Sequence, residues 1–201
     1  MTARTQADRT AATRGALIDA TLTLLVERGW AGITSVAVCE RAGLTRGAFV
    51  HHFTGLPELF AAALEARYTT LAAASEDGAP IASVAGIVER MWESMVATDF
   101  KVVIEAWLAA ANDPTLGEAI GPVIERFAKL MEPEMRSDVL PDEAAQSFFL
   151  LTRETLIGLA LGRATNGGLP LSHEATVLGH LSRIANDHDA RLARTAMENG
   201  R

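Results

Sequence analysis

Helix caps between Thr34 and Thr45 constrain the fold of this chain more than any other feature of its sequence. The side chains of Thr34, Ser35 and Thr45 can each accept a hydrogen bond from a free amide in the first turn of a helix. Gly43 tolerates the left-handed backbone that ends a helix and opens a tight turn. We therefore expect one helix to run from the first caps to Ala42 and a second, short helix to start after Thr45.

The second helix is expected over Arg46–His52 and should cross the first steeply, as in DNA-reading helix pairs. Apolar side chains of the segment fall at spacings that can close one small core: Val38, Cys39, Ala42, Leu44, Phe49 and Phe53. The remaining side chains are left to face outward: Thr45, Arg46, Gly47, Ala48, Val50 and His51. The segment is therefore interpreted as a helix-turn-helix that binds DNA.

Several outward residues carry groups that can contact DNA. Arg46 can donate two hydrogen bonds to guanine, His51 can donate to a base edge or a phosphate, and Ala48 can touch a thymine methyl group. Gly47 lets the backbone come close. The expected DNA-binding residues are Ser35, Thr45, Arg46, Gly47, Ala48, His51 and His52. Short helix pairs joined by glycine also occur in helical proteins that bind no DNA, so the flanking sequence matters.

Helices are predicted on both sides of this pair. Residues from Thr10 to Arg28 carry a broad apolar stripe at helical spacing, which Gly29 ends. Downstream, Pro57 fits the first turn of another helix, where a missing amide costs no hydrogen bond. The predicted inner face of that helix consists of Leu59, Phe60, Ala63 and Leu64.

Together these residues resemble the amino-terminal domain of TetR-family transcriptional regulators. The resemblance covers about the first 65 residues and lies in Glu27–Trp30, Ile33–Val36, Ala42–Gly47, His51–Phe53 and Glu58–Leu59. It implies an all-α homodimer with a three-helix head, a larger ligand-binding body, and release of operator DNA when ligand binds. We accordingly expect a helix-turn-helix DNA-binding domain over residues 1–56 and a helical ligand-binding and dimerisation domain over residues 57–201.

Two positions depart from the family's pattern. The family commonly has a tyrosine before the two histidines and a lysine at the start of the fourth helix, and both usually hold DNA phosphates. This chain has Val50 and Leu56 there. Because phosphate contacts supply much of the affinity for DNA, the two changes predict weaker binding. Candidates for compensation are Ser35, Thr45, His52, the arginines Arg4, Arg9 and Arg14, and the free amides that begin the fourth helix.

Charge and composition fit a DNA-binding head on an acidic body. Residues 1–60 hold six arginines against five acidic residues, whereas residues 61–201 hold twelve basic and twenty acidic residues. An acidic body would confine DNA contact to the head, although acidic bodies are also simply soluble. The single cysteine, Cys39, is expected in the core and suits a reducing compartment. With no secretory signal and no apolar run of about 18 residues, the expected location is the cytoplasm.

Catalytic and metal-binding patterns are missing from the sequence. It contains no Gly-Xaa-Ser-Xaa-Gly elbow, phosphate-binding glycine loop or cysteine cluster. His180 and His188 share a helical face but would lie about 12 Å apart, too far to bind one metal ion. We expect no enzyme activity, no cofactor and no metal site.

Proline and glycine divide the rest of the chain into five further helices, about nine in all. They are expected at Ile81–Thr98, Lys101–Ala111, Thr115–Glu134, Pro141–Asn166 and Ser172–Met197. The helix from Thr115 should kink or restart at Gly121–Pro122, because proline removes a backbone hydrogen bond. No stretch alternates with period two, so the predicted fold class is all-α.

The last two helices are the predicted dimer interface. Gly158 and Gly162 lie one turn apart in Pro141–Asn166, and Leu181 belongs to an apolar stripe in Ser172–Met197. Paired with their copies, the helices would form a four-helix bundle, whereas packing inside one subunit is the alternative. The resemblance favours the homodimer, whose two heads would reach successive major grooves of a palindromic operator.

Aromatic and sulfur-containing side chains concentrate in the body. Such side chains line small-molecule pockets and are also typical of cores. The predicted ligand-lining residues are Trp92, Met95, Trp107, Phe127, Met131 and Phe148. They predict a repressor that a small apolar or aromatic molecule releases from its operator. The alternative is a helical small-molecule-binding protein or minor enzyme whose head no longer binds DNA.

Overall fold

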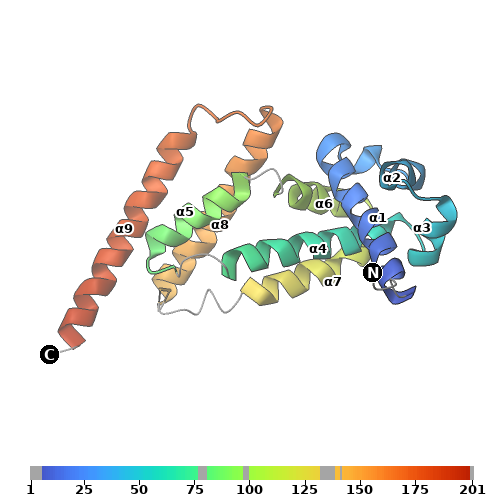
Figure 1. Cartoon of the computed structure of the whole chain (residues 1–201). Coiled ribbons are helices and arrows are strands. Elements are labelled where there is room, and N and C mark those ends of the chain that lie inside the picture. Colours follow the sequence, from blue (N-terminus) through green and yellow to red (C-terminus); the bar gives the residue numbers. More distant parts are fainter. Residues whose placement is uncertain (1–5, 77–80, 97–99, 132–138, 141, 200–201) are drawn as a thin grey trace, which may run out of the picture. The chain divides into compact units, whose positions relative to one another are not determined.

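The computed structural model is helical throughout the residues that it describes, which are 6–76, 81–96, 100–131, 139–140 and 142–199 (Figure 1). This confirms the predicted all-α class. The helices are α1 (Gln6–Arg28), the short 3₁₀ helix η1 (Trp30–Gly32), α2 (Ser35–Ala42), α3 (Arg46–His52), α4 (Leu56–Glu76), α5 (Val84–Val96), α6 (Phe100–Asn112), α7 (Pro114–Met131), α8 (Glu143–Thr165) and α9 (Glu174–Asn199). None of these described helices is both long and apolar enough to cross a membrane.

The helices pack into two compact units. The first comprises Met1–Ser75 and Lys101–Phe127, and the second comprises Glu76–Phe100 and Ala128–Arg201. In this division α6 and most of α7 belong with the first four helices. The predicted functional boundary after residue 56 stays a prediction.

The caps of α2 and α3 are those expected from the sequence. Thr34 Oγ1 accepts a hydrogen bond from the Ala37 amide at 3.1 Å, and Thr45 Oγ1 accepts one from the Ala48 amide at 3.2 Å. Gly43 ends α2 with a φ of 65°, which a residue with a side chain rarely adopts. Local hydrogen bonds therefore fix both ends of the turn that separates the two helices.

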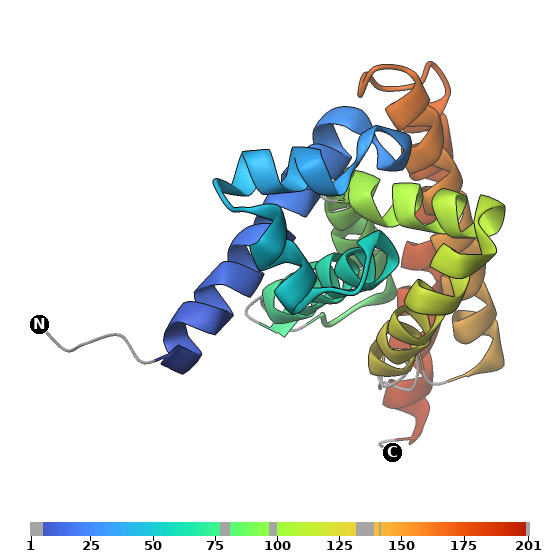
Figure 2. The ribbon, with the colours of Figure 1, turned by 90° about the vertical axis from the view of Figure 1, so that its right-hand side faces the viewer.

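A small apolar core holds α1, α2 and α3 together. Both views of the ribbon place α2 and α3 on one flank of α1 (Figures 1 and 2). The buried side chains of this core include Leu17, Leu24, Leu25, Val38, Cys39, Phe49 and Phe53. Ala42 and Leu44, also predicted here, are only half-buried. The head core therefore forms from the predicted segment together with the predicted stripe of α1.

Two charged side chains of α6 hold the end of α1. Lys101 Nζ donates to the Val26 carbonyl at 2.8 Å, and Glu105 Oε2 accepts from the Trp30 amide at 3.4 Å. Between these contacts Gly29 adopts a φ of 67°, and a Cβ there would stand 3.1 Å from the Glu105 carboxylate. The turn that leads from α1 into the helix-turn-helix is therefore fixed by residues about 75 positions away.

The inner face of α4 is buried as predicted, at Leu59, Phe60, Ala63 and Leu64. The ring of Phe60 lies 4.4 Å from that of Trp30, centroid to centroid. This places Trp30 against α4, so the turn after α1 packs on the helix that follows the helix-turn-helix. The short helix η1 is thus tied to the buried face of α4.

The second unit consists of α5, α8 and α9. In Figure 1, α8 and α9 run in opposite directions on either side of the turn that joins them. Their core with α5 includes Val84, Val88, Phe149, Leu156, Leu181 and Ala185. The Asp189 carboxylate of α9 accepts from the amides of Val84 and Ala85 at 2.7 and 3.1 Å. These are free amides at the start of α5, so a side chain from α9 caps that helix.

Some helix boundaries differ from the sequence-based expectation. Pro122 lies inside a continuous α7, so the predicted restart there is wrong; the missing amide leaves one carbonyl of the preceding turn without its usual donor. The last helix begins at Glu174, two residues after the predicted cap Ser172, and the Glu174 carboxylate accepts from the Leu171 amide at 3.3 Å. Helix α8 begins after Asp142, which accepts from an amide of its first turn, and Gly167 and Gly168 close it as predicted.

Parts of the predicted boundaries lie outside the described residues. They are Pro141, Thr98, Glu134 and residues 77–80 after the fourth helix.

Replacing Asp189 with alanine should remove the cap of α5. The expected loss is about 1 kcal/mol of unfolding free energy, as for other N-cap deletions. Urea unfolding followed by circular dichroism measures it. Asp187→Ala, which removes an exposed carboxylate from the same helix, is the matched control. Equal stabilities of the two variants would show that the cap contributes nothing.

Candidate nucleic-acid interface

One face of α3 is open to solvent. Arg46, Gly47, Val50 and His51 are exposed, whereas Phe49 is buried. This sorting follows from the helical period, because residues three and four apart share a face. The predicted outward residues of this helix therefore do face outward, apart from the half-buried Ala48.

The start of each helix of the pair carries a hydroxyl. Thr45 is exposed, and its oxygen accepts from the Ala48 amide, which leaves its hydroxyl hydrogen able to donate. Ser35 is half-buried at the first position of α2. Behind the turn, the Cys39 thiol lies 3.7 Å from the Thr45 carbonyl, and burial raises the pKa of this thiol. Cys39 therefore supports the turn as a neutral core residue.

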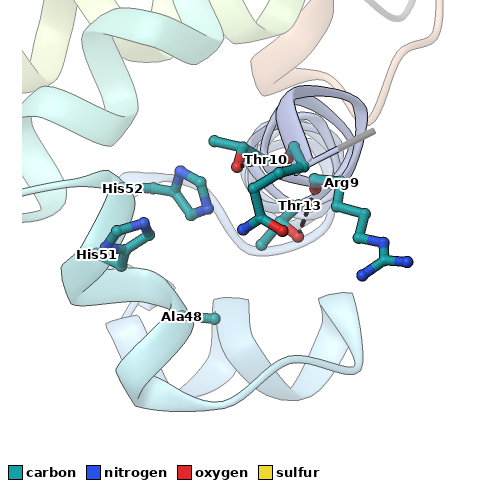
Figure 3. A pocket seen from close by; sticks show the side chains of 7 residues that line it. Arg9, Thr10, Thr13, Ala48, His51 and His52 are labelled. Carbon is teal, nitrogen blue, oxygen red and sulfur yellow. Dashed lines mark hydrogen bonds between the residues drawn. The ribbon is translucent and has the colours of Figure 1, made fainter. Parts of the chain in front are cut away.

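Three residues of α3 border an open hollow of about 200 Å³ beside α1 (Figure 3). Its lining consists of Ala48, His51 and His52 from α3, and of Gln6, Arg9, Thr10 and Thr13 from α1. Both threonine hydroxyls bond to carbonyls of their own helix at 3.0 Å. In Figure 3 the guanidinium of Arg9 points away from the two histidines. The imidazole and guanidinium groups make the rim of this hollow suited to an anion such as a phosphate.

The arginines proposed to compensate for the missing phosphate contacts differ in their surroundings. Arg14 lies over the ring of Phe53, 5.2 Å from its centroid, and so joins α1 to the end of α3. Arg9 is exposed at the edge of the hollow. Arg4 lies outside the described residues. Arg9 is therefore better placed than Arg14 to reach a phosphate.

A carboxylate occupies the start of α4. Glu58 Oε2 accepts from the Thr54 amide at 2.7 Å and from the Thr54 hydroxyl at 2.6 Å. These hydrogen bonds hold the pKa of Glu58 below its ordinary value. Free amides at this end were expected to attract a phosphate, but the negative charge of Glu58 competes for the same positive helix end. The sequence signal for this capping is the threonine that precedes the helix.

The predicted ligand-lining residues are divided between the two units. Trp107 and Phe127 belong to the first unit, whereas Trp92, Met95 and Phe148 belong to the second. The side chain of Met131 lies outside the described residues.

In the first unit, Trp107 and Phe127 meet at Tyr68 of α4. The rings of Tyr68 and Phe127 are stacked with centroids 3.9 Å apart, and Trp107 Nε1 donates to the Tyr68 hydroxyl at 3.3 Å. Burial raises the pKa of Tyr68, and the hydrogen bond from Trp107 opposes this shift. Tyr68 was not among the predicted residues, although it is the only tyrosine of the sequence and follows an apolar helix face.

In the second unit, Phe148 and Trp92 contact distant parts of α8 and α9. Phe148 stacks on His188, with ring centroids 5.2 Å apart. The Arg163 guanidinium lies 5.8 Å from the Trp92 ring. Because Arg163 follows Phe148 by fifteen residues of one helix, the two positions are about 22 Å apart along α8.

Comparisons with known proteins agree with the helix-turn-helix head. Residues 17–63 match the family model described as "Bacterial regulatory proteins, tetR family". The chain is 35% identical over 134 residues to the HTH-type transcriptional regulator CymR of Pseudomonas putida. The aligned part is 64% of this chain and 66% of CymR, so the match spans slightly less than two thirds of that relative.

Solved structures share the fold of the chain. A transcriptional regulator from Rhodococcus sp. Rha1 aligns with a TM-score of 0.64 and 21% identity, over 89% of this chain and 96% of its own. The multidrug binding protein EbrR, complexed with ethidium, aligns with a TM-score of 0.65 and 20% identity, over 88% of this chain and 97% of its own. The matched family and CymR are regulators, in agreement with the prediction that the chain is not an enzyme. Residues 17–63 therefore form an amino-terminal domain of the tetR family of bacterial regulatory proteins.

Proposed function

We propose that this protein regulates transcription by binding a palindromic DNA operator as a homodimer and that a small apolar or aromatic molecule releases it. The observation that carries the proposal is the exposed face of α3, which follows a capped turn within the segment that matches the family model. A helix of this kind, second in a helix-turn-helix, enters the major groove of DNA.

The proposed DNA-binding residues divide by the contact that they make. Arg46 donates to a guanine, and Gly47 lets the helix backbone approach the bases. Phosphates are held by Ser35, Thr45, His51 and His52, with Ala48 lining the hollow beside α1. Phosphate contacts set register and affinity, whereas base contacts set specificity.

A homodimer is supported by apolar side chains that the second unit leaves exposed. They are Leu150, Leu151 and Leu161 of α8 and Ile184 of α9. Gly158 also lies on α8, and a Cβ at that position would meet nothing within 4 Å. Exposed large apolar side chains that gather on neighbouring helices are typical of an interaction site. A second copy of α8 and α9 would cover this surface and complete a four-helix bundle.

The second glycine of α8 has a different role. A Cβ at Gly162 would stand 2.7 Å from Leu171 Cδ1 of the same chain. The small size of Gly162 therefore serves the turn between α8 and α9. Only Gly158 offers the close helix approach that the dimer proposal uses.

An aromatic effector is supported by the cluster of Tyr68, Trp107 and Phe127. The indole N–H of Trp107 is already donated to Tyr68, so the hydroxyl hydrogen of Tyr68 is the polar group of this cluster that can still meet a ligand. Outer ring faces of such a cluster can stack on a flat apolar molecule. EbrR is a multidrug binding protein whose solved complex contains ethidium. That ligand belongs to EbrR, and the similarity of fold makes an aromatic effector a reasonable first class to test on this chain.

A second candidate is a small-molecule-binding protein whose head no longer binds DNA. The carboxylate of Glu58 at the start of α4 favours it, as does Val50 in place of a phosphate-holding residue. In that case an aromatic ligand would raise the melting temperature, and selection from genomic DNA would recover nothing specific.

Arg46→Ala should weaken operator binding by about 1 to 3 kcal/mol and relax the preference at one base pair in each half-site. The operator is selected from genomic fragments, and binding is followed by fluorescence anisotropy at fixed salt. Arg126→Ala is the control, because Arg126 is an exposed arginine paired with Glu65 of α4. If the wild-type dimer has no preference among random duplexes at low salt, the regulator proposal fails.

Glu58→Gln should strengthen binding to any duplex by about two- to fivefold, because it removes a negative charge from the positive end of a helix. Fluorescence anisotropy with a random duplex measures this change at 50 mM salt, where the Debye length is about 14 Å and surface charges are only partly screened. Glu65→Gln on the same helix is the control. Unchanged or weaker binding of Glu58→Gln would rule out competition by this carboxylate.

The same variant has a predictable effect on stability. The folded-state pKa of Glu58 is lowered, so its carboxylate stabilises the fold above its unfolded pKa, and this contribution is lost as pH falls through the folded pKa. Wild type should therefore melt above Glu58→Gln at pH 7, and the two melting temperatures should converge in acid. A pH-independent difference would contradict this explanation.

Leu151→Glu should convert the dimer to monomers, because it places a charge in the proposed bundle. Sedimentation velocity measures the mass. Leu108→Glu is the control, since Leu108 on α6 is 51% exposed and Leu151 is 60% exposed. A Leu151→Glu protein that remains dimeric would place the interface elsewhere.

A further inference from the structure

An apolar side chain stands in the middle of the exposed face of α3. Val50 is 64% exposed and follows Gly47 and Arg46 by three and four residues, so all three lie on one side of the helix. The side chain of valine is branched at Cβ and holds its two methyl groups in one strongly preferred orientation on a helix. Any surface that meets Arg46 therefore also meets two fixed methyl groups.

Ala48 is less well placed for an apolar contact with DNA. It is half-buried and lines the hollow between α3 and α1, together with His51 and His52 (Figure 3). Its methyl group thus borders α1, whereas the methyl groups of Val50 are open to solvent. The apolar contact expected of Ala48 from the sequence fits Val50 better.

The chemistry of the major groove limits what Val50 can recognise. The base edges there present hydrogen-bond donors, hydrogen-bond acceptors and one apolar group, the C5-methyl of thymine. The Val50 side chain has no hydrogen-bonding group, so donors and acceptors opposite it would lose water without gaining a partner. The thymine methyl is the one feature of the groove that it complements.

We propose that Val50 is a specificity-determining residue that selects a thymine by contact with its methyl group. The inference rests on the proposed function, in which α3 enters the major groove. Four residues of helix advance about 6 Å, and successive bases of one strand are about 3.4 Å apart. The selected thymine should therefore lie within about two base pairs of the guanine that Arg46 contacts.

The test replaces each symmetric pair of operator thymines with deoxyuridine, which lacks only the C5-methyl group. At one position, wild-type binding should weaken by about fourfold for each half-site, the effect of leaving one methyl group unburied. In Val50→Ala the same replacement should change nothing. Alanine is the best helix former, so this variant retains α3.

Val36→Ala is the matched control. Val36 is also an exposed valine of the helix-turn-helix, at 53%, but it lies on α2. The first helix of such a pair crosses the DNA backbone. Deoxyuridine substitution should therefore weaken operator binding of Val36→Ala as much as it weakens binding of the wild type.

The outcomes separate the two proposals. If wild type prefers its operator over random duplexes yet no deoxyuridine substitution weakens it, the role of Val50 is overturned and the regulator proposal stands. The role of Val50 is also overturned, and the regulator proposal also stands, if deoxyuridine weakens operator binding of Val50→Ala as much as it weakens binding of the wild type. If the protein selects no operator at all, both proposals fail.

Discussion

The hydrogen bonds that Thr34 and Thr45 accept determine where α2 and α3 begin, and the surface of the head depends on those two starting points. Helix α3 has only seven residues, and each residue turns the helix by about 100°. A start displaced by one residue would turn Val50 into the core and expose Phe49. The Thr45 cap therefore decides which side chains this helix can present to DNA.

Local and distant contacts explain which features could be predicted. Caps at Thr34 and Thr45, the stop at Gly43 and the buried face of α4 depend on residues within about one turn of each other, so the sequence pattern predicts them. The capping of α5 by Asp189 joins residues 105 positions apart, and no local pattern contains it. Tyr68 likewise gained its partners Trp107 and Phe127 only when three helices packed together.

The head separates two properties of a DNA-binding surface. In the proposed function, the face of Arg46, Gly47 and Val50 distinguishes bases, whereas Val50 and the carboxylate of Glu58 lower the capacity of the head to hold phosphates. Specificity and affinity come from different contacts, so one can be kept while the other is lowered. In the same proposal, the hollow beside α1 offers Arg9 and two imidazole groups to the backbone of DNA.

The carboxylate at the start of α4 has a consequence for induction. A ligand can shift an equilibrium only by its difference in affinity for the two states, and each tenfold in operator occupancy requires about 1.4 kcal/mol of that difference. A regulator held less tightly by phosphates needs a smaller difference to leave its site. Glu58 would thus let an effector with only a small difference in affinity for the two states release the protein from its operator. The same carboxylate would lower the fraction of operator that is occupied when no effector is present.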